Sequence, residues 1–170
     1  HEVRGPDCRD GANGPSLSEP GQPQLDALQD RLCYQFSDLT LLKRALTHRS
    51  AGRNHNERLE FLGDAVIGLA AASAFYKRFS DADEGVLSRL RALVVSGHSL
   101  AAIARDKDLS SCLILGESER KSGGRHRDSI LADTLEALLG AVALDAGPET
   151  ALQVAGEWLR SAVESASPSD

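Results

Sequence analysis

Apolar residues recur along this chain at helical spacing, and no stretch shows the strict alternation of a half-buried strand. The segment 56–79 is apolar around most of its circumference when it is read as a helix, which is typical of a helix buried in a core. Polar caps and breakers separate the other apolar stripes, for example Ser37 or Asp38 before one of them and the pair Gly147-Pro148 between two others. The pattern therefore predicts an all-α bundle.

The predicted helices share apolar edges and polar boundaries, and they cover residues 24–32, about 38–46, 56–79, 84–96, 99–106, 128–145 and a last segment that starts at 148. Residues 109–115 are interpreted as a loop or one turn of helix, and 117–127 as a loop. The same pattern predicts a flexible leader at 1–23, which is rich in Gly, Pro and Ser, a single domain at 24–165, and a tail or truncated linker at 166–170.

Carboxylates interrupt the apolar helix on one side. At about 100° per residue, Glu57, Glu60 and Asp64 fall within roughly 60° of one another. Acids on a buried helix are unfavourable unless positive charge meets them, and hard divalent cations take oxygen ligands. On spacing alone, a solvated acidic face that includes Arg58 explains the stripe equally well.

A second pair of acids, Asp133 and Glu136, shares one face of the helix predicted at 128–145. If the two helices pack side by side, these acids and those of the first helix converge into an oxygen-rich pocket suited to Mg²⁺ or Mn²⁺. The chain has no Glu-x-x-His pair, which disfavours a di-iron bundle. Metal-assisted phosphodiester hydrolysis is a reaction that such a pocket suits.

The string Asn56-Glu57-Arg58-Leu59-Glu60-Phe61-Leu62-Gly63-Asp64 resembles the signature motif of the ribonuclease III family. The similarity continues through Ala45–Ser50, Asp83–Gly85, Lys121–Gly124 and Ser129–Leu138, and it covers roughly 25–164. It implies a ribonuclease III endonuclease-domain helical bundle that acts as a homodimer, with 24–165 as the catalytic domain. Bacterial members usually carry a double-stranded-RNA-binding domain after this one, and the sequence ends at Asp170 before any such domain.

The resemblance implies an Mg²⁺-dependent endoribonuclease, with Mn²⁺ as a substitute, which cuts double-stranded RNA to leave 5′-phosphate and 3′-hydroxyl ends. RNA processing, for example of ribosomal RNA precursors, would be its role. The alternative is a non-catalytic RNA-binding or ribosome-associated scaffold on the same fold, and loss of the acids would indicate it. We expect a cytoplasmic protein without an organic small-molecule cofactor.

The resemblance also implies a role for each matched residue. The catalytic residues would be Asp64 and Glu136, and the metal ligands Glu60, Asp64, Asp133 and Glu136. The auxiliary acids would be Glu57 and Glu84, although an acid at a helix start such as Glu84 also favours the helix dipole without any further role. Phe61, beside the acidic stripe, would insert into a socket of the partner subunit.

Two polar features remain open. The tract 117–127 is the one dense basic stretch, and it predicts contact with RNA phosphates through Arg120, Lys121, Arg125 and Arg127. A mobile, solvated loop is equally compatible with that tract. His48 is predicted either to reach the RNA backbone or the active site, or to hydrogen-bond a helix end or loop, which is the commoner arrangement for a lone histidine.

Composition changes this interpretation little. The chain has 170 residues and a net charge of −6, which argues against a basic nucleic-acid module of the usual kind. It does not argue against a nuclease whose carboxylates bind metal. The three cysteines are widely spaced and form no zinc or redox motif. No apolar run reaches the length expected of a membrane span, so we expect no membrane partner.

Overall fold

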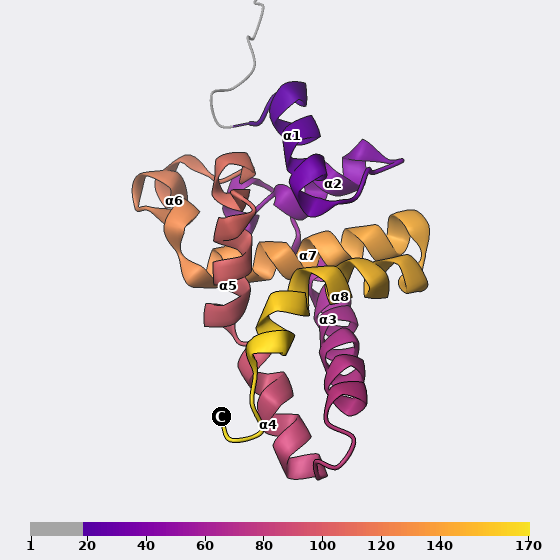
Figure 1. The fold of residues 1–170 in the computed structure, drawn as a ribbon. Coiled ribbons are helices and arrows are strands. Elements are labelled where there is room, and N and C mark those ends of the chain that lie inside the picture. The colour runs from indigo at the N-terminus through magenta and orange to yellow at the C-terminus, as the bar shows by residue number, and fades with distance from the viewer. Residues whose placement is uncertain (1–18) are drawn as a thin grey trace, which may run out of the picture.

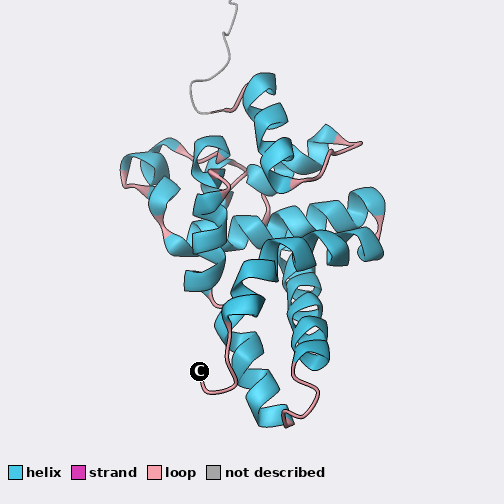
Figure 2. Ribbon diagram, viewed as in Figure 1, coloured by secondary structure: helices cyan, strands magenta, loops and turns pink. Residues whose placement is uncertain are grey.

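The computed structural model describes residues 19–170, so most of the predicted leader at 1–23 lies outside it. In that part of the chain every regular element is a helix, as predicted (Figure 2). The α-helices are α1 (Gln22–Leu32), α2 (Leu39–Leu46), α3 (Glu57–Arg78), α4 (Glu84–Val94), α5 (Gly97–Asp106), α6 (Glu117–Lys121), α7 (Asp128–Ala146) and α8 (Pro148–Ser165). Short 3-10 turns are η1 (Arg49–Ala51), η2 (Leu109–Cys112) and η3 (Gly124–His126).

Helix α7 runs through the middle of the molecule, and the other helices are arranged around it (Figure 1). Helix α3 crosses it and makes the most extensive contact with it, while α5, α8 and α2 also pack on it. Eleven residues of α7 are buried, from Ile130 to Val142, which explains why this segment is almost continuously apolar. The site described below lies where α3 and α7 cross.

Helix α3 is buried on one side only. Its buried residues follow the core-facing stripe and are Leu59, Gly63, Val66, Ile67, Ala71 and Phe75. Phe61 and Leu69, by contrast, remain 82% and 55% exposed. The prediction of a helix buried around most of its circumference is therefore wrong for this exposed apolar side.

The expectation that no apolar run could span a membrane is also wrong by length and composition. Among the described residues, α3 is the single helix that is long and apolar enough, with a mean hydropathy of 1.4 in its most apolar window, while α4 and α5 pass only together, as a pair bent by 46°. This helix packs against α7, α8 and α4 in the core. A core helix passes the same test of length and apolarity as a spanning helix.

Two glycines allow α3 and α7 to approach until their backbones touch. A Cβ atom on Gly63 would lie 1.6 Å from the carbonyl oxygen of Glu136, and one on Gly140 would lie 2.1 Å from that of Leu59. Neither position therefore accepts a larger side chain without separating the helices. The residues beside the glycines, including the acids of both helices, are brought into one place.

Several boundaries differ from the prediction. Helix α1 begins at Gln22, because Pro23 fits the first turn of a helix. The predicted loop 117–127 contains α6 and η3, whereas η2 within 109–115 agrees with the turn of helix allowed there. In the tail 166–170, the Ser167 N–H donates to the Asp170 carboxylate over 2.7 Å and closes a turn.

Candidate active site

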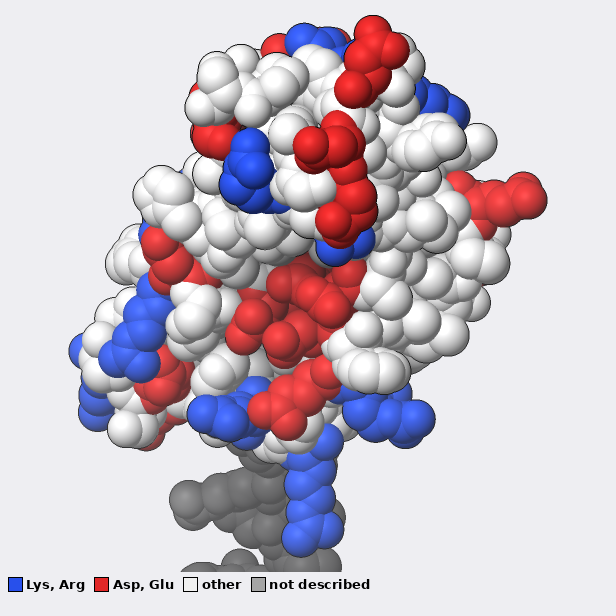
Figure 3. Space-filling model, turned by 90° about the horizontal axis from the view of Figure 1, so that it is seen from below, with Lys and Arg blue, Asp and Glu red and all other residues white. Residues whose placement is uncertain are grey.

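Asp and Glu side chains gather in a hollow on one face of the molecule, with Lys and Arg side chains at its edges (Figure 3). A pocket of about 550 Å³ lies where helices α3, α6 and α7 meet the turn that follows α2. Its acidic lining residues are Glu57, Glu60, Glu119 and Asp133. These acids come from three helices, α3, α6 and α7, and tertiary packing brings them to one pocket.

The four acids proposed as metal ligands form two pairs across the α3–α7 crossing. Glu60 donates a hydrogen bond to Asp133, and Glu136 donates one to Asp64. Each pair joins one acid from α3 with one from α7, on either side of Gly63. The structure thus brings together all four residues that the sequence predicted to converge.

Burial and the neighbouring carboxyl groups raise the pKa values of three of these acids, Glu60, Asp133 and Glu136. Burial, then the charge of Asp133, raises the pKa of Glu60 to about 7. Burial, then the hydrogen bond with Asp64, raises the pKa of Glu136 to about 8. Burial also raises the pKa of Asp133, although its hydrogen bond with Glu60 opposes the shift. Near neutral pH the cluster therefore holds protons unless another positive charge replaces them.

A divalent cation is a natural replacement, because carboxylate oxygens are the ligands that Mg²⁺ and Mn²⁺ prefer. Within the described residues, no three side chains are already arranged around a common point that would hold a metal ion. The two protonated pairs explain this, since each carboxyl points to its partner. The donor chemistry fits a metal, and the carboxyl groups would turn from one another toward it.

Comparison with known proteins identifies the family. The family model described as ribonuclease-III-like matches residues 38–163. The chain belongs to this family. Membership makes it an endonuclease of the ribonuclease III type, as the sequence predicted, and members of the family generally depend on a divalent metal.

Two solved structures of the nuclease domain of ribonuclease III from Campylobacter jejuni are similar to this ribonuclease-III-like chain. One is 40% identical with a TM-score of 0.78, over 81% of this chain and 96% of that one, and its description concerns a flexible region involved in dimer formation. The other is 39% identical with a TM-score of 0.79, over 84% and 98%. Dicer from Pichia stipitis is 28% identical with a TM-score of 0.57, over 75% of this chain and 55% of Dicer.

The two auxiliary acids of this ribonuclease-III-like domain lie in different places. Glu57 is at the rim of the pocket, and its carboxylate lies 3.5 Å from the Arg49 guanidinium. Glu84 begins α4, beyond the far end of α3, and accepts a hydrogen bond from the Ser88 hydroxyl. Because α3 continues to Arg78 and rises about 1.5 Å per residue, Glu84 lies on the order of 20–30 Å from Glu60 and Asp64 of its own chain.

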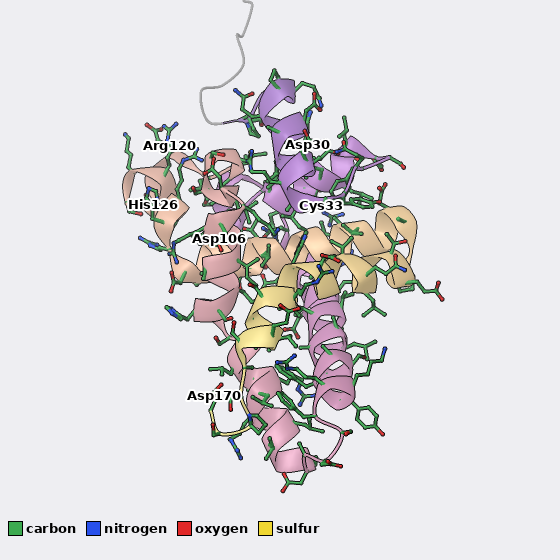
Figure 4. All side chains as sticks on the ribbon, in the orientation of Figure 1. Asp30, Cys33, Asp106, Arg120, His126 and Asp170 are labelled. Atoms are coloured by element: carbon green, nitrogen blue, oxygen red, sulfur yellow. The ribbon has the colours of Figure 1, made fainter. Side chains whose placement is uncertain are left out.

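Three of the four predicted RNA-binding cations have partners within the protein. Lys121 lies 2.9 Å from Glu117, and Arg127 lies 2.6 Å from Glu119. Arg125 is half-buried and donates to two backbone carbonyls, those of Ser110 and Leu113. Arg120 lies on the lobe formed by α6 and η3, where Figure 4 labels it together with His126. Contact of the four cations with RNA stays a prediction.

Glu119 is an acid of the pocket that the sequence interpretation missed. Its side chain is only 20% exposed, and Arg127 pairs with it. Gly124 packs against it so closely that a Cβ there would lie 2.7 Å from the Glu119 Cγ atom. The available signal was its position two residues before the family-like segment Lys121–Gly124, but that tract was interpreted through its cations.

Proposed function

We propose that this domain hydrolyses phosphodiester bonds in double-stranded RNA with Mg²⁺ and leaves 5′-phosphate and 3′-hydroxyl ends. The observation that carries the proposal is the meeting of four carboxylates from α3 and α7 at the glycine crossing, in a chain of the ribonuclease-III-like family. Processing of RNA precursors, including ribosomal RNA, in the cytoplasm would be its cellular role.

In this proposal, Glu60, Asp64, Asp133 and Glu136 hold the metal ion. When bound, the metal supplies an acidified water and stabilises charge on the leaving oxygen. The carboxyl groups give up the protons that they share in its absence, because the cation takes over the neutralisation of their charge. Arg49 and Arg127 line the pocket together with two of these ligands, Glu60 and Asp133, and favour an anionic phosphodiester there.

The proposed enzyme is a homodimer, because each pocket serves one strand of the duplex. Phe61 is 82% exposed at the edge of the site. Beside it lies a pocket of about 520 Å³ whose lining includes Arg58, Leu62 and Leu144. We place the Phe61 ring of one protomer in this pocket of its partner, since such an aromatic side chain is otherwise unfavourably exposed.

This dimer also gives Glu84 a place to act. Its distance from the acids of its own chain prevents a direct role there, so any auxiliary role would be at the partner's site. Phe61→Ala should convert the dimer to monomers at micromolar concentration, since truncating a packed Phe costs about 3–5 kcal/mol. Sedimentation would show this, and an unchanged dimer would contradict the proposed socket.

The activity is tested with long duplex RNA, incubated with Mg²⁺ or with EDTA and analysed on a gel, with end groups read by mass spectrometry. We expect internal cuts in Mg²⁺ only, and little cutting of single-stranded RNA or duplex DNA of the same sequence. Binding without cleavage in any divalent cation would contradict the enzyme and support the scaffold. All four acids are present, which is why we favour the enzyme.

A further inference from the structure

His48 lies in the wall of the acidic pocket, on a segment that is fixed from a distant part of the chain. Its backbone N–H donates to the Ile114 carbonyl over 2.9 Å, and Thr47 forms an isolated parallel bridge with Ile114. The Ser50 hydroxyl accepts a hydrogen bond from the Gly116 N–H over 2.9 Å. A Cβ on Gly116 would lie 2.2 Å from the Ser50 carbonyl oxygen, so the two segments are in direct contact.

The hydrogen bonds of the ring assign its tautomer. Nδ1 accepts from the Ser50 backbone N–H over 3.1 Å and lies 2.7 Å from the Ser50 Oγ atom. A backbone N–H can only donate, so Nδ1 carries no proton. In the neutral ring the proton is therefore on Nε2. Among the described contacts Nε2 has no protein partner, and the ring lines the pocket.

The ring remains neutral although acids surround it. The charges of Glu119, Asp133 and Glu57 favour protonation, whereas Arg49 opposes it. Burial has the largest effect and lowers the pKa of His48 below its ordinary value. The bond from the Ser50 N–H acts in the same direction, because it would be lost if Nδ1 were protonated. A protonated His48 would compete with a bound cation for interaction with these carboxylates, and a neutral ring does not.

We propose that His48 is a substrate-binding residue whose Nε2–H donates a hydrogen bond to a non-bridging oxygen of a phosphodiester in the pocket. This inference rests on the nuclease function proposed above. A phosphate oxygen fits best, because it is an acceptor that carries negative charge and Arg49 and Arg127 line the same pocket. A ribose 2′-hydroxyl is the alternative acceptor, and the experiment separates the two.

Two substitutions separate the two functions of the ring, which are the acceptor at Nδ1 and the donor at Nε2. In His48→Asn, the side-chain oxygen can take the place of Nδ1 and keep the bond from the Ser50 N–H, because Asn is a favoured capping residue, but the Nε2 donor is lost. In His48→Gln, the longer amide N–H can reach the position of Nε2, but the capping acceptor is lost. Both variants are measured for melting temperature and for affinity to a short RNA duplex in Ca²⁺.

We expect the two variants to rank in opposite orders in the two measurements. His48→Asn should melt close to the wild-type protein and bind RNA about 10- to 100-fold more weakly, as expected for loss of a hydrogen bond to a charged acceptor. His48→Gln should melt lower and bind more tightly than His48→Asn. If affinity simply follows melting temperature, or if His48→Asn binds as the wild-type protein does, His48 has only a structural role and the proposal is wrong.

The acceptor is identified with modified RNA. Duplexes carry a stereochemically defined phosphorothioate at each position near the cut, or a 2′-deoxy nucleotide there, and are bound to both proteins. We expect one phosphorothioate to weaken wild-type binding and to have little further effect on His48→Asn, because both changes remove the same bond. Such coupling to a 2′-deoxy nucleotide instead, or to no modification, would overturn the phosphate assignment. A wild-type protein that binds these duplexes but never cleaves them in Mg²⁺ would refute the proposed function alone.

Discussion

The α3–α7 crossing and the α6–η3 lobe border the same pocket, but they treat negative charge in opposite ways. In and beside the lobe each acid has a cation: Glu117 has Lys121, Glu119 has Arg127, and Asp128 has Arg105. At the crossing, none of the ion pairs in the described part of the chain includes Glu60, Asp64, Asp133 or Glu136.

The pKa values follow this difference. The hydrogen bond from Arg105 holds the pKa of Asp128 below its ordinary value, whereas burial raises the pKa of Glu136 to about 8. The charged side chains of the lobe pair with one another and stabilise its structure, whereas the acids of the crossing have no cationic partner among the described residues and are available to bind a ligand. Changes at the crossing should therefore affect catalysis and its pH dependence, and changes in the lobe should affect only local stability.

The largest effect is expected from Glu136→Gln, which removes a charge at the crossing and keeps the shape of the side chain. Cleavage of duplex RNA under single-turnover conditions should fall on the order of a thousandfold or more, with little change in melting temperature. Glu117→Gln in the lobe should cleave at nearly the wild-type rate. Near wild-type cleavage by Glu136→Gln would refute the role of the crossing.

Asp133→Asn should lower cleavage to a similar degree, because the two acids act on one site. The double variant should be little worse than either single variant, since residues that act as a unit are non-additive. Cleavage rates of the two single variants and the double variant, compared at saturating enzyme, measure this non-additivity. Multiplicative effects would show that the two carboxylates work independently.

The next effect concerns the packing that brings the acids together. Gly63→Ala places a methyl group against the Glu136 carbonyl, so the free energy of unfolding should fall by about 3 kcal/mol, near the upper end for overpacking. Gly156→Ala, in α8, meets open space and should raise it by up to about 1 kcal/mol. Urea denaturation compares the two variants, and equal stabilities would contradict the close crossing.

Without a divalent cation, stability should fall as the pH rises from about 4.5 to about 8. In this range Glu60 and Glu136 keep protons in the folded state that they lose in the unfolded state, so the folded state binds more protons and higher pH favours unfolding. Denaturation in EDTA at several pH values measures this slope. Glu136→Gln should flatten it and Glu117→Gln should not, while Mg²⁺ should flatten it in the wild-type protein.

The smallest effects belong to the lobe. Arg125→Ala removes the guanidinium donor from the Ser110 and Leu113 carbonyls, and among the described contacts only Ser110 keeps another donor, the Leu113 N–H, so the free energy of unfolding should fall by about 1–3 kcal/mol. Lys121→Ala breaks an exposed pair and should change it by less than about 1 kcal/mol. Thermal melts at low and high salt separate the two. A larger effect for Lys121→Ala would contradict the structural role of Arg125.

Local pattern predicted the helices because periodic apolar residues and caps are properties of neighbouring positions. The convergence of Glu60 with Asp133 followed from a family resemblance, since spacing within one helix does not show which helix packs against it. The α6–η3 lobe was missed because its five-residue helix depends on distant contacts, such as those of Arg125. Glu119 was missed because its tract was interpreted through the cations, and its burial against Gly124 exists only in the folded chain.

The junction between the turn at His48 and the segment at Gly116 has a consequence for folding kinetics. Ser50 and Gly116 are 66 residues apart in sequence, and closing a chain segment of that length costs about 4 kcal/mol of conformational entropy. A contact of this kind tends to form after the helices between its ends have docked. The imidazole therefore reaches its final orientation late in folding, and substitutions at the junction should mainly accelerate unfolding rather than slow folding.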